Sequence, residues 1–235
     1  MPAVRRAPRV GPARAWACTG LLCLFTLGCG DDGALAPYTD GHADILIELV
    51  DADSEPTLDA VLLATGATID GTFLTGGAVS LADIEVRSKA RFVRPDDDGG
   101  AFAPVCAEAG EEIPWLPQSL RDANDSDSPF LGIAASFGGA DLEDSQIRLA
   151  LVSVDSPSGL GNYSIWQDGF PPRFFMSSCD GIDAGDDMEL TDGHDHYNMG
   201  FSEPGEWTVT YRASAVVVGS QAPVETEFEV RYVLE

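Results

Sequence analysis

The sequence has few basic residues. It contains 13 lysines and arginines against 39 aspartates and glutamates, which gives a formal net charge of −26 at pH 7. Four of the arginines lie within the first 14 residues, so residues 29–235 hold nine basic side chains (13 minus 4) and carry a formal charge of −30 (9 minus 39). A surface of this sign repels nucleic acid and anionic headgroups, and we expect no nucleic-acid partner. Its purpose is either to solvate an exported protein or to gather cations.

The sequence also lacks the motifs of the common enzyme classes. It has no Gly-x-Ser-x-Gly elbow, no P-loop, no Rossmann glycine signature and no His-Glu-x-x-His. The three histidines, His42, His194 and His196, are the sole imidazoles that could serve as a base. We therefore expect a protein that is not an enzyme, and a metal-dependent hydrolase ranks last among the alternatives.

The N-terminal residues predict export. Residues 1–14 carry four arginines and no acid, and the apolar run that follows, residues 15–27, is too short for a comfortable membrane span. The segment Leu27-Gly28-Cys29 resembles the lipobox of bacterial lipoproteins, in which cleavage before the cysteine frees it for lipidation. We predict a signal peptide at residues 1–28 and a lipidated Cys29; an ordinary secreted protein is the alternative.

The predicted anchor sets the domain limits and the location. Residues 29–39 are predicted to be the lipidated cysteine and a short tether, and residues 40–235 a single domain of sandwich size. Multiple acyl chains on one cysteine hold a protein stably at a membrane. Gly30 stands where some inner-membrane lipoproteins have Asp, so we expect the outer membrane, with the domain facing either the periplasm or the outside.

Alternation of apolar and polar residues predicts an all-β fold. The strand-like segments are DILIELV near Ile45, EVRSKARFV near Val86, QIRLALVSV from Gln146 and NYSIWQ from Asn162. The alternation is clearest in residues 207–213 and 228–234, which predict two antiparallel, half-buried strands. With 25 glycines and 15 prolines between short strands, the sequence predicts a β-sandwich of immunoglobulin-like or jelly-roll-like type.

Two of the five cysteines belong to the predicted domain. Cys106 and Cys179 form an even pair, and an exported protein meets an oxidising environment. We predict a disulfide, which would stabilise the fold by about 4 kcal/mol because it closes a long loop. A pair of cysteine metal ligands is the less favoured alternative, since the C-x-x-C spacing is missing.

The histidines occur in two similar contexts, TDGHAD and TDGHDH. Residues i and i+2 of a strand point to the same side, so His194 and His196 can face one ion, and His42 shares a side with Asp44. If the two segments lie on neighbouring strands, these four side chains form a three-histidine, one-carboxylate site. Zinc is the favoured metal, with Mn, Cu, Ni or Fe also compatible. The alternative is that the imidazoles hydrogen-bond at a strand end without a metal.

Several segments resemble choice-of-anchor M domain proteins, also called surface-anchored or anchored-repeat proteins. TDGHADILIEL resembles the opening of that family, IPWLPQS and FLGIAAS its central segments, and GNYSIWQDG a later strand. GHDHYNMGFSEPGEWTVTYRAS is similar to its closing segment, which is the most specific of these. Tyr197, Met199 and Trp207 depart from that pattern, and the cysteine pair is not part of it.

The resemblance implies an exported surface domain, in some bacteria associated with ABC transporters for zinc and manganese. By motif position it implies roles for His42, Asp44, His194, His196 and Asn198. Two functions follow. The first is an envelope lipoprotein that binds a divalent transition metal and serves metal uptake. The second is a structural or adhesive surface domain without metal chemistry.

Overall fold

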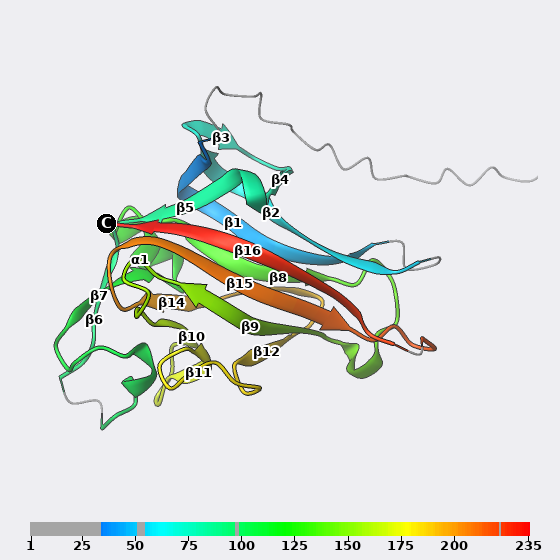
Figure 1. Cartoon of the computed structure of the whole chain (residues 1–235). Coiled ribbons are helices and arrows are strands. Elements are labelled where there is room, and N and C mark those ends of the chain that lie inside the picture. Colours follow the sequence, from blue (N-terminus) through cyan, green and yellow to red (C-terminus); the bar gives the residue numbers. More distant parts are fainter. Residues whose placement is uncertain (1–33, 51–54, 97–98, 221) are drawn as a thin grey trace, which may run out of the picture.

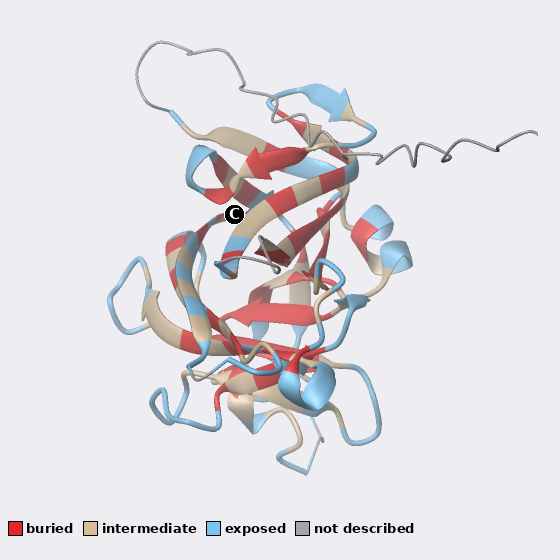
Figure 2. Cartoon of the chain, turned by 90° about the vertical axis from the view of Figure 1, so that its right-hand side faces the viewer, coloured by how far each residue is buried: buried red, intermediate tan, exposed pale blue. Residues whose placement is uncertain are grey.

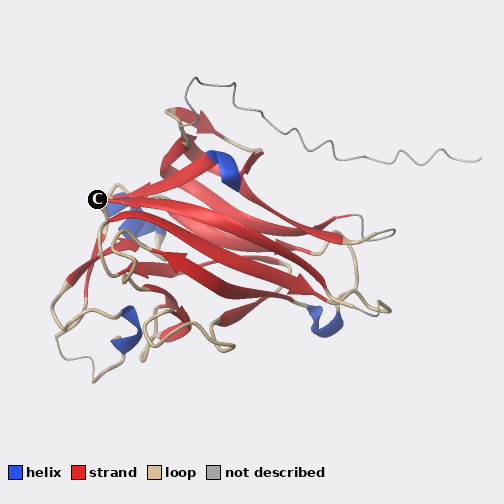
Figure 3. Ribbon diagram, viewed as in Figure 1, coloured by secondary structure: helices blue, strands red, loops and turns tan. Residues whose placement is uncertain are grey.

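The computed structural model describes residues 34–50, 55–96, 99–220 and 222–235 (Figure 1). The predicted signal peptide and Cys29 lie outside these residues. Strands dominate the described part and its helices are short (Figure 3). The helical turns are η1 (Leu81–Asp83), η2 (Ala103–Val105), α1 (Leu120–Asp125) and η3 (Glu143–Ser145).

The described strands form two sheets. The larger sheet has the order β12-β9-β15-β16-β5-β1-β2-β3, with β8 pairing β1 and β13, and β4 pairing β2. Its strands are β1 (Ala36–Val50), β2 (Thr57–Ile69), β3 (Thr72–Leu74), β4 (Ala78–Ser80), β5 (Ile84–Ser88), β8 (Phe130–Ser136), β9 (Ile147–Asp155), β12 (Asp187–Leu190), β13 (Gly193–His196), β15 (Gly205–Ala215) and β16 (Val224–Leu234). The smaller sheet has the order β11-β10-β14-β7-β6. Its strands are β6 (Arg91–Val93), β7 (Glu112–Leu116), β10 (Tyr163–Gln167), β11 (Arg173–Ser177) and β14 (Asn198–Phe201).

The predicted all-β sandwich is confirmed, and its core follows from the alternation in the sequence. On β15, Trp207, Val209, Tyr211 and Ala213 are all buried, and β15 pairs with β16 in the predicted antiparallel sense. Buried residues of the larger sheet pack against buried residues of the smaller one in a single cluster, and Figure 2 shows buried segments along the strands and exposed ones at the loops. Burial of these apolar side chains is what joins the two layers.

The strand pairing is more mixed than in immunoglobulin or jelly-roll sandwiches, which are antiparallel. In the described residues β1 pairs in parallel with both β5 and β8, and β16 pairs in parallel with β5. Parallel neighbours need crossover connections, so strands distant in sequence lie side by side. The mixed pairing places β8 next to β1, the strand that carries His42.

The tether predicted to reach Thr39 ends earlier, because β1 already begins at Ala36. Tyr38 is completely buried, and its hydroxyl donates to the carbonyl oxygen of Gly41 at 2.7 Å. Burying an aromatic ring and satisfying its hydroxyl stabilises the strand at this position. The packed domain therefore includes residues that the sequence had assigned to the tether.

The two ends of the larger sheet approach each other. Following the pairings from β13 through β8, β1, β5, β16, β15 and β9 leads to β12, yet β12 ends at Leu190 and β13 begins at Gly193. A connection of two residues thus joins the opposite ends of this path. We call the region between these two strands the seam.

A disulfide lies beside the smaller sheet. Cys106 follows η2 and is joined in a disulfide to Cys179, which follows β11, with Cα atoms 5.6 Å apart. The bond spans 73 residues of sequence. Beside η2, the ring of Trp166 is fully buried against Phe92, Phe102 and Phe174. The disulfide therefore ties the two segments that border this aromatic cluster.

Candidate metal centre

His42 lies at an irregularity in β1. The register between β1 and β2 shifts between Gly41 and Ala43, so that His42 falls at the shift. Gly41 has a φ of +80°, and a Cβ there would lie 1.9 Å from the carbonyl oxygen of Gly66. Glycine is thus required before this histidine, which explains the first Asp-Gly-His segment.

The second segment places two imidazoles from one short strand. Gly193 also has a positive φ, of +133°, and β13 begins there. His194 and His196 follow at alternate positions and share a side of β13. Asp195 points the other way, where its Oδ2 accepts a hydrogen bond of 2.8 Å from Gln167 Nε2 on β10. The alternation expected from the sequence is therefore present.

The two histidine segments are not on neighbouring strands, which corrects the arrangement expected from the sequence. β8 lies between them, pairing with β1 on one side and β13 on the other. Its Gly132 is in register with Asp44 on β1 and with His196 on β13. The side chains must therefore meet across an intervening strand, over a distance of two strand spacings.

Gly132 makes this meeting sterically feasible. A Cβ at Gly132 would lie 2.1 Å from Asp44 Oδ1 and 3.0 Å from His196 Cε1. No side chain larger than hydrogen fits without displacing the carboxylate or the imidazole. A glycine inside a strand often marks such a close approach. The space above β8 is thereby left to the side chains of its two neighbours.

The three imidazoles converge. His42, His194 and His196 each offer a ring nitrogen, and these atoms all lie within 4.8 Å of one another. The Nε2 atoms of His42 and His196 are 3.2 Å apart. Two nitrogen ligands of a tetrahedral zinc ion, each about 2.05 Å from the metal, are separated by about 3.3 Å. The observed spacing fits a shared ion as well as a hydrogen bond between two neutral rings.

Asp44 lies next to the three imidazoles and contacts His42. Its side chain is buried, with 4% of the residue exposed, and its Oδ1 lies 3.6 Å from His42 Nε2. Among the described residues Oδ1 has no hydrogen-bond partner. A buried carboxylate oxygen without a partner is costly unless a cation compensates it. The group of ligand atoms that come together comprises the three imidazoles without Asp44, so the carboxylate lies beside the centre, where it can balance the charge of an ion.

Contacts outside the centre orient the rings. The Nδ1 atom of His42 lies 2.5 Å from Thr65 Oγ1, which fixes the ring with Nε2 toward the other histidines. The ring of Phe130 stacks on His196, with centroids 3.7 Å apart and planes 7° from parallel. Both imidazoles are therefore held in place from outside the metal position.

Burial lowers the pKa of His196 below its usual value. The Asp44 carboxylate opposes this effect, and His42 and His194 add to it. The neutral ring is the form that binds a metal. His194 is exposed, whereas the other two imidazoles are half-buried, so solvent reaches the centre from the side of His194.

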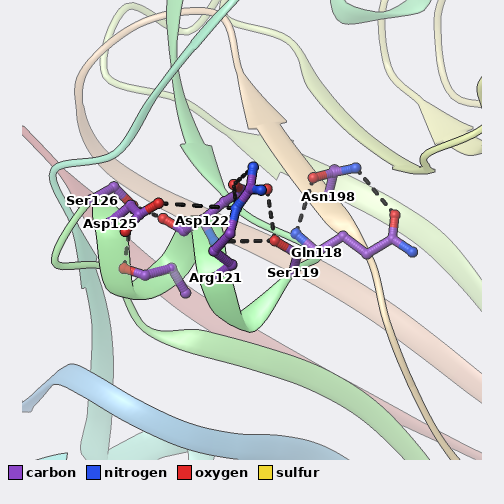
Figure 4. Close-up of polar contacts among 8 residues, drawn as sticks. Gln118, Ser119, Arg121, Asp122, Asp125, Ser126 and Asn198 are labelled. Carbon is purple, nitrogen blue, oxygen red and sulfur yellow. Dashed lines mark hydrogen bonds and ion pairs between the residues drawn. The ribbon is translucent and has the colours of Figure 1, made fainter.

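Asn198, the fifth residue singled out by the family resemblance, belongs to a different cluster. It is 1% exposed, and its Oδ1 accepts from Trp115 Nε1 at 2.9 Å and from the Gln118 backbone N–H at 3.0 Å. Its Nδ2 donates to Asp168 Oδ1 at 2.8 Å and to Gln118 Oε1 at 3.3 Å. Figure 4 shows Asn198 beside Gln118, at the start of α1. Since both polar atoms are satisfied by protein groups, Asn198 joins β14 to its surroundings and is not a ligand here.

Three contributors to the centre were missed in the sequence: Thr65, Phe130 and Gly132. Thr65 and Phe130 carry no pattern of their own. Gly132 did offer a signal, because it interrupts the apolar run FLGIAAS and glycine weakens a strand interior. A glycine at this position indicates that another group approaches the strand closely, but it does not identify that group.

Comparisons with models of known protein families, with curated proteins and with solved structures found no match. The resemblance to choice-of-anchor M proteins therefore stays a prediction. The described residues include no helix with the length and apolar character needed to cross a membrane.

Proposed function

We propose that this protein is an envelope lipoprotein that binds one divalent transition metal ion at His42, His194 and His196, with Asp44 as charge partner. Zinc is the metal we expect first, because three imidazoles with a carboxylate suit it. Exposure of His194 leaves one side of the ion accessible. A site of that kind can load and release its metal, as a protein that serves metal uptake requires.

The observation that carries the proposal is the convergence of the three imidazoles beside Asp44. Three imidazoles from β1 and β13 meet over Gly132, next to a buried carboxylate oxygen without a partner. A cluster that served the fold alone would be expected to satisfy its buried polar atoms within the protein. An ion at the centre supplies the missing positive charge.

The anchor and the partner rest on the sequence. The basic segment, the apolar run and the lipobox-like Leu27-Gly28-Cys29 support export and lipidation at Cys29, and through it an outer-membrane location. A metal ABC transporter or another envelope component is the partner we expect for such a protein. Labelling cells with a radioactive fatty acid, beside a Cys29→Ala variant, tests the anchor independently of the metal.

The test of metal binding measures the metal content of the purified protein by mass spectrometry, beside a His194→Ala/His196→Ala double variant. We expect about one ion per chain, and a loss of affinity on the order of 1000-fold or more in the variant, because two of the nitrogen ligands are removed. Circular dichroism should show the same folded domain, since β13 pairs with β8 through its backbone.

A matched control addresses the general attraction of an acidic protein for cations. Glu225→Ala/Glu229→Ala removes two exposed carboxylates from β16 and should leave the metal content unchanged. Equal loss in both double variants, or no metal taken up on titration of the unaltered protein, would contradict the proposal. If the histidine pair prevents folding, the single variant at exposed His194 provides the same comparison.

The second candidate is a structural or adhesive surface domain. It is favoured by the 3.2 Å contact between the Nε2 atoms of His42 and His196, which can be a hydrogen bond without any metal. This candidate predicts that replacing His196 destabilises the metal-free domain. The metal-binding proposal predicts that the same change costs metal-free stability only the packing of the ring on Phe130, about 1 kcal/mol, while metal binding is lost.

A further inference from the structure

A cleft of about 620 Å³ lies along the seam. Its lining includes β12, β13 and the residues between them, with Gln167 of β10 and Arg173 of β11 on the side of the smaller sheet. Ile133 and Ala135 also line it, and on β8 these alternate with Gly132 and Ala134. The cleft thus adjoins the reverse side of the strands that bring the histidines together.

The two strands that border the cleft each have an unpaired edge. In the described part of the chain, β12 pairs with β9 alone and β13 with β8 alone. On β13, however, the His196 carbonyl oxygen already accepts from Gln167 Nε2 and its N–H donates to Asp195 Oδ1. The edge of β12 is therefore the one whose backbone N–H and C=O groups can pair with an added extended chain. Such a chain would complete the sheet where its ends approach each other.

The charge of the residues that line the cleft indicates which charge a bound segment should carry. Four acidic residues and one basic residue line the cleft: Asp187, Glu189, Asp192, Asp195 and Arg173. Three of these five side chains already have a partner: the Arg173 guanidinium lies 4.5 Å above the centre of the Phe175 ring, Asp187 pairs with Arg148, and Asp195 accepts from Gln167. The carboxylates left to attract a ligand are therefore those of Glu189 and Asp192. Glu189 and Asp192 are exposed. A basic segment complements this lining, and an acidic one is repelled.

The floor of the cleft is apolar. Ile133, Met188 and Leu190 are buried residues that border it, while Glu189 alternates with the last two on β12. An added strand presents side chains alternately to its two sides. One side would face this apolar floor and the other the carboxylates.

We infer that the seam binds an extended segment of a partner protein in which basic and apolar residues alternate, and that this segment pairs with the edge of β12. His194 of the metal centre is also among the residues that line the cleft. Binding of the segment depends on the edge of β12 and on the carboxylates of the cleft, so the inference does not rest on the proposed function. It identifies a protein-binding surface next to the histidine centre.

The experiment uses the hexapeptide Lys-Val-Lys-Val-Lys-Val, fluorescently labelled, at an ionic strength of about 0.15 M, which screens interactions between distant exposed charges. We expect saturable binding to one site, and slower hydrogen exchange of amides in β12 when the peptide is bound. The peptide Glu-Val-Glu-Val-Glu-Val should not bind.

Two pairs of substitutions locate the site. Glu189→Gln/Asp192→Asn removes two exposed charges from the cleft and should weaken binding on the order of tenfold. Glu225→Gln/Glu229→Gln removes two exposed charges from β16, outside the cleft, and should change binding less than about twofold. Equal weakening by both pairs, equal binding of the acidic peptide, or unchanged hydrogen exchange in β12 would overturn the inference.

Discussion

The segment from Gly193 to Gly200 contributes to two polar clusters that differ in one respect. At Asn198 the side-chain oxygen and nitrogen both find protein partners, and the residue is buried. At Asp44, which His196 approaches from β13, a buried oxygen has none among the described residues. A satisfied cluster needs nothing from outside to be stable, whereas a cation would stabilise an unsatisfied carboxylate. The comparison separates residues whose polar atoms the fold satisfies from residues that are able to accept a ligand.

Replacing Asn198 should have the largest effect on the fold. In Asn198→Ala, the Trp115 indole N–H and the Gln118 backbone N–H lose their acceptor in a buried place. We expect the free energy of unfolding to fall by about 3 kcal/mol. Urea unfolding measures this. His194→Ala, at an exposed position, should cost less than about 0.5 kcal/mol. A larger loss of stability in His194→Ala than in Asn198→Ala would contradict the distinction between the two clusters.

The second largest effect is expected on metal affinity, when the space above β8 is filled. Gly132→Ala adds a Cβ that would lie 2.1 Å from Asp44 Oδ1 and 3.0 Å from His196 Cε1. Since the carboxylate or the ring must move, we expect metal affinity to fall about 10- to 100-fold, or roughly 1.4–2.8 kcal/mol. Isothermal titration with zinc measures the change. Gly139→Ala serves as the matched control, because no atom lies within 4 Å of an added Cβ there, although its positive φ adds some backbone strain.

Only a small change in stability is expected at Asp44. In the absence of metal, Asp44→Asn removes a buried negative charge without a hydrogen-bond partner at Oδ1, so the free energy of unfolding should change by less than about 1 kcal/mol. With metal present, the increase in melting temperature on adding zinc should shrink, because affinity falls. Thermal unfolding with and without zinc measures both. A large loss of metal-free stability would place Asp44 with Asn198, among residues that hold the fold.

The sequence predicted the parts of this fold that depend on local patterns. Alternation identified β15 and β16, and the repeated Asp-Gly-His context identified three residues that converge in space. It did not predict that β8 separates the two histidine segments, since strand order is set by packing between residues far apart in the chain. For the same reason the role of Gly132 was not recognised, because its neighbours come from two other strands.

The ligands of the centre lie far apart in the chain, with His42 and His196 separated by 154 positions. No fragment that lacks either end of the domain can assemble them. An ion can therefore be captured only after the sheet has closed around β8. If the chain is exported before it folds, as its first residues suggest, the compartment in which it folds decides which metal it acquires. In that case metal levels in the cytoplasm would have no direct influence on an ion bound at the proposed site.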